Sequence, residues 1–161
     1  VDDTGLTGLV GVPLADDRGI VVLDRLLPRL SQHEPVIAAV GHVFPLTALA
    51  MGKVALADLE QDDALAVAAQ LGHDRESSPL LRTQLSEIRR LGYAVSLGEY
   101  AGHVNAVAAP LRDRYGEITA VLCLMGPASH LPPETVTEVA GRLLAMIAAL
   151  GSQPGGLEPM A

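Results

Sequence analysis

The order of strand-like and helix-like segments is the feature that most constrains the fold of this chain. Leucine- and valine-rich segments on either side of a polar turn predict a hairpin and a third strand, over residues 6–14, 19–27 and 35–41. Apolar spacing and strong helix formers then predict helices over residues 46–59, 64–71 and 79–91. Strands follow at 93–97, 104–111 and 118–125, and a broad apolar stripe predicts a last helix over 132–150. This order of strands, helices, strands and a helix indicates an α+β fold with a mostly antiparallel sheet.

Residues that begin and end helices support these boundaries. Ser78 and Pro79 suit an N-cap and the first position of a helix, and Gly92 suits the position after its end. Gly52 lies inside the first predicted helix, where glycine costs about 1 kcal/mol relative to alanine. It therefore indicates a close approach of backbone or ligand, or tight packing.

Composition and charge exclude several classes of protein. With 49% hydrophobic and 19% charged residues among 161, the chain is not intrinsically disordered. A net charge of −8 gives no overall attraction for phosphate backbones, so these residues alone are a poor nucleic-acid binder. The single cysteine, Cys123, forms no internal disulfide, and no apolar stretch reaches the 18 residues of a membrane span, so we expect a cytoplasmic protein. Because the sequence starts at Val1 and enters strand-like sequence almost at once, we expect an upstream part to be missing.

No motif for catalysis, metal binding or a cofactor stands out. The five histidines do not share helical metal-ligand spacing, and neither HExxH nor CxxC occurs. Gly52 and Lys53 lack the rest of a phosphate-binding loop, so a structural helix lysine is the better interpretation. Cys123 lies in an apolar strand and is expected to be a buried, inert side chain rather than a reactive thiol. Glu87 and Glu99 would act as paired carboxylates only if the fold brought them together. We therefore expect no catalytic residue, no metal site and no cofactor.

Three segments in this order resemble a known family. They are residues 44–57 (FPLTALAMGKVALA), residues 88–95 (IRRLGYAV) followed by Glu99, and residues 106–113 (AVAAPLRD) followed by Gly116 and residues 124–127 (LMGP). Residues 4–7 and 21–25 also look like the first hairpin of that family's domain. Together they resemble the effector-binding domain of IclR-type bacterial transcription regulators, over residues 4 to 150.

The resemblance implies a GAF/profilin-like antiparallel sheet with flanking helices over residues 1–150. From their own composition, we expect residues 151–161 to form a flexible tail. It implies that this chain is the small-molecule-sensing, oligomerising half of a regulator, most often a repressor, and is not an enzyme. An N-terminal winged helix-turn-helix, absent from this chain, would bind DNA. Such regulators assemble as homodimers or tetramers on paired half-sites.

The resemblance also implies a ligand pocket between the sheet and the segment entering the first helix. Carried over by position, its residues are Ala50, Met51, Gly52, Ser96, Ala106, Cys123 and Met125. A helix N-terminus there would hold a carboxylate, and the strand residues would supply apolar walls. Small-acid sensors of the family commonly have Ser-x-Ser-Gly-Pro where this chain has residues 123–127 (CLMGP), and Met51 replaces a small residue. We therefore expect an apolar or aromatic acid rather than glyoxylate or pyruvate, or a partly closed pocket.

Two alternatives stay open at this point. The chain would be a stand-alone GAF-like sensor or a small enzyme if no DNA-binding segment preceded it in the gene. It would be a dimerisation module alone if the pocket were filled by its own side chains.

Overall fold

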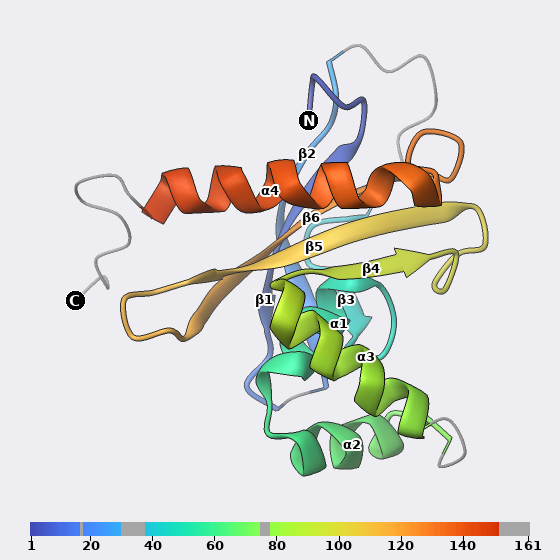
Figure 1. Ribbon diagram of the computed structural model, residues 1–161, viewed down its shortest axis with the longest axis vertical. Helices are drawn as coiled ribbons and strands as arrows, with labels where there is room; N and C mark the ends of the chain where they lie inside the picture. The colour runs from blue at the N-terminus through green and yellow to red at the C-terminus, as the bar shows by residue number, and fades with distance from the viewer. Residues whose placement is uncertain (17, 30–37, 75–77, 152–161) are drawn as a thin grey trace.

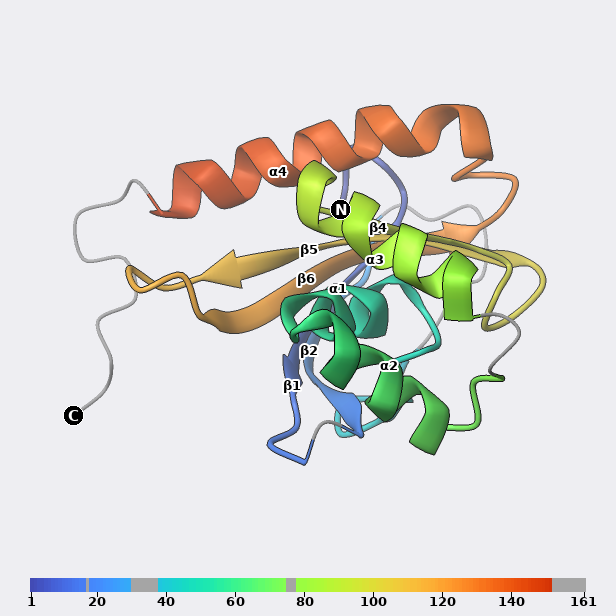
Figure 2. The ribbon, with the colours of Figure 1, turned by 60° about the horizontal axis from the view of Figure 1, so that its bottom comes forward.

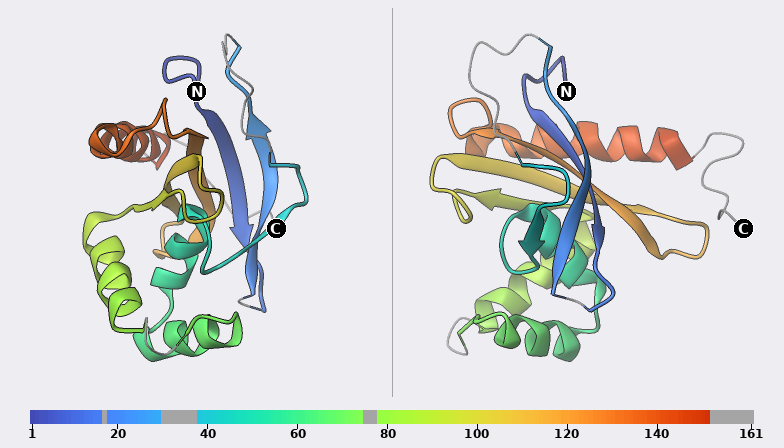
Figure 3. Two further views of the ribbon diagram at one scale, coloured as in Figure 1. Left: turned by 90° about the vertical axis from the view of Figure 1, so that its right-hand side faces the viewer. Right: turned by 180° about the vertical axis from the view of Figure 1, so that it is seen from behind.

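A curled antiparallel sheet carries the fold (Figure 1). The computed structural model describes residues 1–16, 18–29, 38–74 and 78–151. In these residues the sheet has six strands: β1 (Thr7–Pro13), β2 (Gly19–Leu26), β3 (Val43–Pro45), β4 (Ala94–Leu97), β5 (Val104–Arg112) and β6 (Ile118–Pro127). Their order across the sheet is β3-β2-β1-β6-β5-β4, so β3 and β4 are its two edges. Figure 3 shows that the β1–β2 hairpin runs steeply across the direction of β5 and β6.

Helices cover both faces of the sheet (Figure 2). They are α1 (Ala50–Asp58), α2 (Gln61–Gln70), α3 (Ser78–Leu91) and α4 (Val136–Gly151), the last preceded by a short 3-10 helix, η2 (Pro133–Thr135). The first three lie on one face and α4 lies alone on the other. In the described part of the chain, no helix is long and apolar enough to cross a membrane.

Helix α1 is the innermost helix, and its composition explains why. All of its residues except Asp58 are buried, as expected for a helix that is apolar around most of its circumference. It packs directly on the sheet, while α2 and α3 pack against it from outside. The sheet residues beneath it are small: Ala106 and Ala108 on β5 are both fully buried, which allows the helix to approach closely.

The predicted α+β fold with an antiparallel sheet is confirmed. The hairpin of β1 and β2, the three later strands and the helices lie where the pattern placed them, to within a few residues. Gly92 ends α3 as expected: its φ is +79°, and its N–H donates to the carbonyl of Ile88 at 2.8 Å.

Two boundaries differ from the prediction. The predicted third strand at 35–41 lies partly outside the described residues, and its described part, 38–41, forms a turn, with strand β3 beginning at Val43. Helix α1 begins at Ala50 rather than at residue 46, because the preceding segment turns: the Ala48 N–H donates to the Pro45 carbonyl at 3.1 Å. The predicted tail beyond residue 151 lies outside the described residues.

Candidate functional site

Of the seven residues predicted to bind a ligand, four lie on the sheet face that α1 covers and three form the first turn of α1. Strand pairing places Ser96 on β4 opposite Ala106 on β5, and Ala106 opposite Met125 on β6. Cys123, two residues along β6, lies on the same face, opposite Ala108 and Leu9. The other three residues, Ala50, Met51 and Gly52, form the first turn of α1. All seven side chains or backbones are buried.

Met51 and Gly52 have different roles in this contact. Met51 reaches down to β1, where its Cε occupies the space that a Cβ on Gly11 would need. Gly52 faces the chain segment before the helix: a Cβ there would lie 2.5 Å from the Pro45 carbonyl oxygen and 2.7 Å from that of Leu46. The close approach expected at Gly52 is therefore an approach of backbone. The Met51 side chain fills space between α1 and β1, as expected for a larger residue at this position.

The N-terminus of α1 offers hydrogen-bond donors that the helix itself does not use. Its first backbone bond runs from Lys53 N to Leu49 O at 3.3 Å, so the N–H groups of Ala50, Met51 and Gly52 have no partner within the helix. Among the residues that the structure describes, no side chain caps this end. The positive end of the helix dipole lies here as well, which favours an anion.

Ser96 adds a donor on the facing sheet. Its side chain is fully buried, and its Oγ has no hydrogen-bond partner among the described residues. A buried hydroxyl without a partner costs about 1–3 kcal/mol, so such a group calls for an explanation. Since Ser96 shares its sheet face with Ala106 and Met125, the hydroxyl belongs to an otherwise apolar wall beneath α1. Uncapped N–H groups and a free hydroxyl beside apolar walls form a suitable arrangement for an organic carboxylate.

Cys123 contributes only apolar wall. Its side chain is buried, and burial raises the pKa of the thiol, which therefore stays protonated and unreactive at neutral pH. The prediction that this residue is buried is confirmed, and the raised pKa agrees with an inert side chain.

Leu49, which sequence reasoning missed, introduces backbone strain at the entry to α1. It is the N-cap residue, is fully buried, and has φ of +42°, a region that side chains disfavour. No sequence pattern indicates this strain, because it depends on the conformation of the segment before α1.

The strain at Leu49 predicts an unusual order of two substitutions. We expect Leu49→Gly to be less destabilising than Leu49→Ala by about 1 kcal/mol, because glycine adopts positive φ without strain. Leu56 provides the control, since it is fully buried in the same helix with ordinary geometry. At this position the Gly substitution should be more destabilising than the Ala substitution by about 1 kcal/mol. Urea denaturation of the four variants measures both differences, and the same order at both positions would contradict the strain.

Lys53 is a second residue whose role the structure defines. Its side chain is buried, its Nζ forms an ion pair with Glu99, and it donates to the Val95 carbonyl at 3.3 Å. The ammonium lies at the wall of a surface pocket of about 240 Å³ between α3 and β4, which Glu87 and Glu99 also line. The pair thus joins α1 to the edge strand β4 and to the loop that follows it. The predicted structural role of Lys53 is confirmed.

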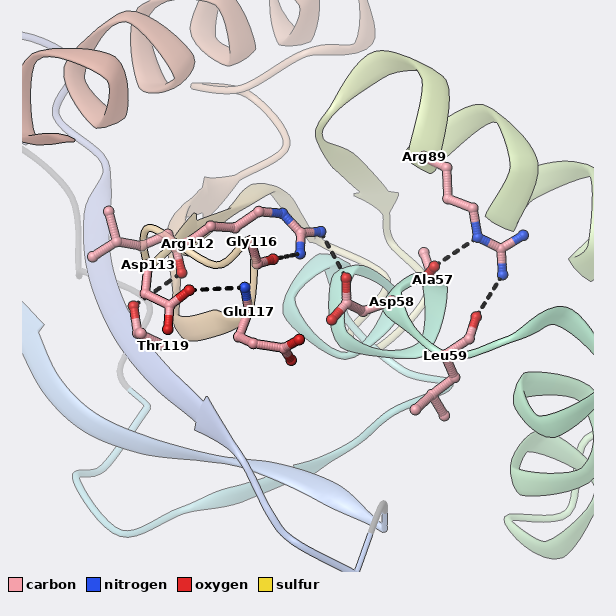
Figure 4. Close-up of polar contacts among 10 residues, drawn as sticks. Ala57, Asp58, Leu59, Arg89, Arg112, Asp113, Gly116, Glu117 and Thr119 are labelled. Atoms are coloured by element: carbon pink, nitrogen blue, oxygen red, sulfur yellow. Dashed lines mark hydrogen bonds and ion pairs between the residues drawn. The ribbon is translucent and has the colours of Figure 1, made fainter. Parts of the chain in front are cut away.

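The C-terminal end of α1 is fixed by two arginines (Figure 4). Arg89 on α3 donates from Nε to the Ala57 carbonyl at 2.7 Å and from a terminal nitrogen to the Leu59 carbonyl at 2.8 Å. Arg112, at the end of β5, lies 2.7 Å from an Asp58 carboxylate oxygen and donates to the Gly116 carbonyl. Carbonyls at a helix end attract positive charge, so both contacts hold α1 in place at the end opposite the candidate site.

The fold and this site define a class of protein: an α+β domain whose curled sheet encloses the uncapped N-terminus of a buried helix, with donors suited to a small organic ligand. Comparison with known sequences then gives its family. The chain belongs to the family described as "Bacterial transcriptional regulator IclR C-terminal", which it matches over residues 6–151. It is therefore the C-terminal domain of a bacterial transcription regulator of this family.

Individual relatives agree with this assignment. The HTH-type transcriptional repressor AllR of Klebsiella pneumoniae is 30% identical over 130 residues, which cover 77% of this chain and 47% of that protein. A transcriptional regulator from Alicyclobacillus acidocaldarius has a crystal structure with TM-score 0.78 and 28% identity, covering 94% of this chain and 61% of that one. The inducer-binding domain of PobR from Acinetobacter, solved with 3-hydroxybenzoic acid, has TM-score 0.74 and 22% identity over 91% of this chain and 87% of that one, and shows the fold alone. The chain spans about half the length of the curated relatives it matches.

Proposed function

We propose that this domain senses a small organic acid between the first turn of α1 and the sheet. The observation that carries the proposal is the unpartnered Ser96 Oγ, buried on the sheet face that α1 covers. Together with the N–H groups of Ala50 and Met51, which have no partner within α1, it provides donors for a carboxylate. Ala106, Cys123 and Met125 provide the surrounding apolar surface.

The composition of these walls supports an apolar or aromatic acid as the effector. Two of the wall positions hold Cys123 and Met125, which have no hydroxyl to bind a second polar group of the ligand. A ligand with one carboxylate and an apolar body matches this distribution of polar groups better than glyoxylate or pyruvate. The PobR domain, which shares the fold, was solved with an aromatic acid, 3-hydroxybenzoic acid, which carries one hydroxyl besides its carboxylate.

Binding requires a change in the position of Met51. The seven predicted residues are packed together, and Met51 fills the space over Gly11. A ligand would therefore bind a rearranged state better than the packed one and shift the population toward it. This population shift provides the signal that a regulator needs.

The rest of the regulator follows from the family. We propose that the full protein is a cytoplasmic repressor that binds DNA through an N-terminal winged helix-turn-helix. We further propose that it assembles as a homodimer or tetramer. The HTH-type transcriptional repressor AllR, of which the match covers 47%, supports the helix-turn-helix and the repressor role in this proposal. No catalytic role is assigned, since the matched relatives are transcription regulators and Cys123 is buried.

A titration with carboxylic acids tests the site directly. Benzoate, 3-hydroxybenzoate, hexanoate and glyoxylate would be added to the purified domain, and its melting temperature recorded. An acid present at ten times its Kd should stabilise the domain by about 1.4 kcal/mol. We expect an aromatic or aliphatic acid to do so, and glyoxylate not to. A panel that leaves the melting temperature unchanged would instead support a dimerisation module whose pocket Met51 has filled.

Substituting Ser96 separates binding from stability. We expect Ser96→Ala to stabilise the unliganded domain by about 1 kcal/mol, because it removes a buried hydroxyl without a partner. The same change should weaken binding of the active acid about tenfold, because the carboxylate loses a donor. Urea denaturation and the acid titration measure the two effects.

A second serine serves as the matched control for this experiment. Ser86 is exposed on α3, and its Oγ donates to the Arg82 carbonyl at 3.0 Å. Ser86→Ala should change stability by less than about 0.5 kcal/mol and leave the affinity unchanged. If Ser96→Ala behaved like this control, the hydroxyl would have no part in the site.

A further inference from the structure

An aromatic cluster joins the two opposite edges of the sheet. Phe44 lies on β3, at one edge, and Tyr100 lies in the loop that leaves β4, at the other edge. The centroids of their rings are 5.1 Å apart in an edge-to-face contact. His42 completes the cluster: its ring centroid lies 4.5 Å from that of Phe44, and its Nε2 lies 3.5 Å from the Tyr100 hydroxyl. The curl of the sheet thus brings together strands that are farthest apart in its order.

This cluster lies at the end of the sheet where the candidate effector site is. Phe44 is buried in the same core cluster as Leu49, Ala50 and Met51. The loop that carries Tyr100, residues 98–103, starts two residues after Ser96 and ends three residues before Ala106. Tyr100 itself is 47% exposed, so the contact forms the boundary between this core and solvent.

The loop has the features of a segment that moves as a unit. Gly98 has φ of +67° at its start, and a Cβ there would lie 3.1 Å from the Gly102 carbonyl oxygen. Two backbone bonds hold its shape, from Gly98 N to Val104 O at 3.0 Å and from Val104 N to Ala101 O at 2.8 Å. The described residues tie it to the rest of the domain through the Tyr100 contacts with Phe44 and His42, the Glu99–Lys53 ion pair and the packing of Ala101 against the core. At its far end the His103 carbonyl accepts from the Ala128 N–H at 2.9 Å, so the loop would pivot there.

We propose that the Phe44–Tyr100–His42 cluster closes the entrance to the effector site, and that an effector enters when residues 98–103 swing away from β3. The inference rests on the proposed location of the site beneath α1. Tyr100 is in this view a positioning residue: it holds the loop against Phe44 and so sets how often the entrance is open. Since an aromatic pair of this kind changes an equilibrium by about tenfold, the closed state is favoured without being locked.

Cys123 provides a probe for this opening that needs no effector. It is the single cysteine of the chain, it is buried, and it lies on the wall of the site. A thiol reagent such as 5,5′-dithiobis(2-nitrobenzoate) reacts with it only when the site opens. Met125, opposite Ala106, separates Cys123 from the entrance by two residues, or about 7 Å along β6.

We expect Tyr100→Ala to raise the labelling rate of Cys123 about tenfold, because the ring contact that closes the entrance is lost. Tyr100→Phe keeps the ring against Phe44 and should stay within about twofold of the unsubstituted protein. Tyr115→Ala is the matched control: this tyrosine is 74% exposed at the β5–β6 turn and touches no part of the entrance, so the rate should not change.

Global unfolding is separated from opening by measuring stability independently. If the labelling rate of Tyr100→Ala rose only in proportion to its loss of stability in urea, or did not rise, the proposed entrance would be wrong. A second probe, Ser96→Cys in a Cys123→Ala background, lies nearer the loop and should be accelerated by Tyr100→Ala at least as strongly as Cys123. No acceleration at this position would also overturn the proposal. Because no ligand is present, these outcomes are independent of whether the acid titration succeeds.

Discussion

Gly52→Ala is expected to destabilise the domain by about 3 kcal/mol, although the same substitution inside an ordinary helix stabilises it by about 1 kcal/mol. The reason is the backbone of the segment before α1. A Cβ on Gly52 would lie 2.5 Å from the Pro45 carbonyl oxygen, 2.7 Å from the Leu46 carbonyl oxygen and 2.8 Å from the Leu46 carbonyl carbon. Backbone atoms cannot rotate away as the end of a side chain can. Either α1 or the segment leading into it must move.

The matched control is Gly141→Ala in α4. Gly141 is also inside a helix, but it is exposed, and a Cβ there would meet nothing within 4 Å. We expect this variant to be stabilised by up to about 1 kcal/mol. Urea denaturation of both variants measures the two effects, which should have opposite signs. A stabilising Gly52→Ala would show that the segment at Pro45 and Leu46 yields easily and does not fix the start of α1.

The prediction for Gly52 also concerns the proposed site. The N–H groups of Ala50 and Met51, which have no partner within α1, belong to the same turn as Gly52, so a displaced helix start would move these donors relative to Ser96. We therefore expect the residual folded protein of Gly52→Ala to bind the active acid more weakly. This loss is distinct from that of Ser96→Ala, which removes one donor while leaving the helix in place.

Much of the fold was predictable because the apolar pattern of a long segment indicates whether it is a strand or a helix. The apolar stripe of α4 shows the helical period over 16 residues, whereas β5 and β6 are apolar runs of 9 and 10 residues bounded by turn residues. Strand β3 was not predictable, since Val43–Pro45 is too short to show a period and is fixed by pairing with β2. The start of α1 was placed four residues early because residues 46–49 are good helix formers held in a turn by tertiary contacts.

The candidate site was predictable only as a set of residues. The family resemblance selected positions on four elements, and the strand register shows that Ser96, Ala106 and Met125 are neighbours. The features that give the site its properties depend on distant segments. The Phe44–Tyr100 contact joins opposite sheet edges, and the positive φ of Leu49 depends on how its segment is held. Neither produces a local pattern in the sequence.

The Lys53–Glu99 pair leads to the second large prediction, in which the more exposed partner matters more. The Lys53 side chain is 6% exposed and that of Glu99 is 40% exposed. Removing Glu99 leaves a buried ammonium with the Val95 carbonyl as its remaining partner among the described residues. Removing the charge of Lys53 instead leaves a carboxylate that water can solvate. Loss of Glu99 therefore leaves an unpaired charge that is buried and costly, whereas loss of the Lys53 charge leaves one that water solvates at little cost.

We expect Glu99→Ala to destabilise the domain by about 3 kcal/mol, the lower end of the range for breaking a buried ion pair, because Glu99 is partly solvated. Lys53→Met keeps most of the buried stem and should cost about 1 kcal/mol. In the double variant the methionine carries no charge that could be left unpaired. The double variant should therefore lose much less stability than the sum of the losses of the two single variants. Urea denaturation of the three variants measures these values. A larger loss for Lys53→Met than for Glu99→Ala would mean that the buried stem and its bond to Val95, rather than the charge pair, hold α1 to β4.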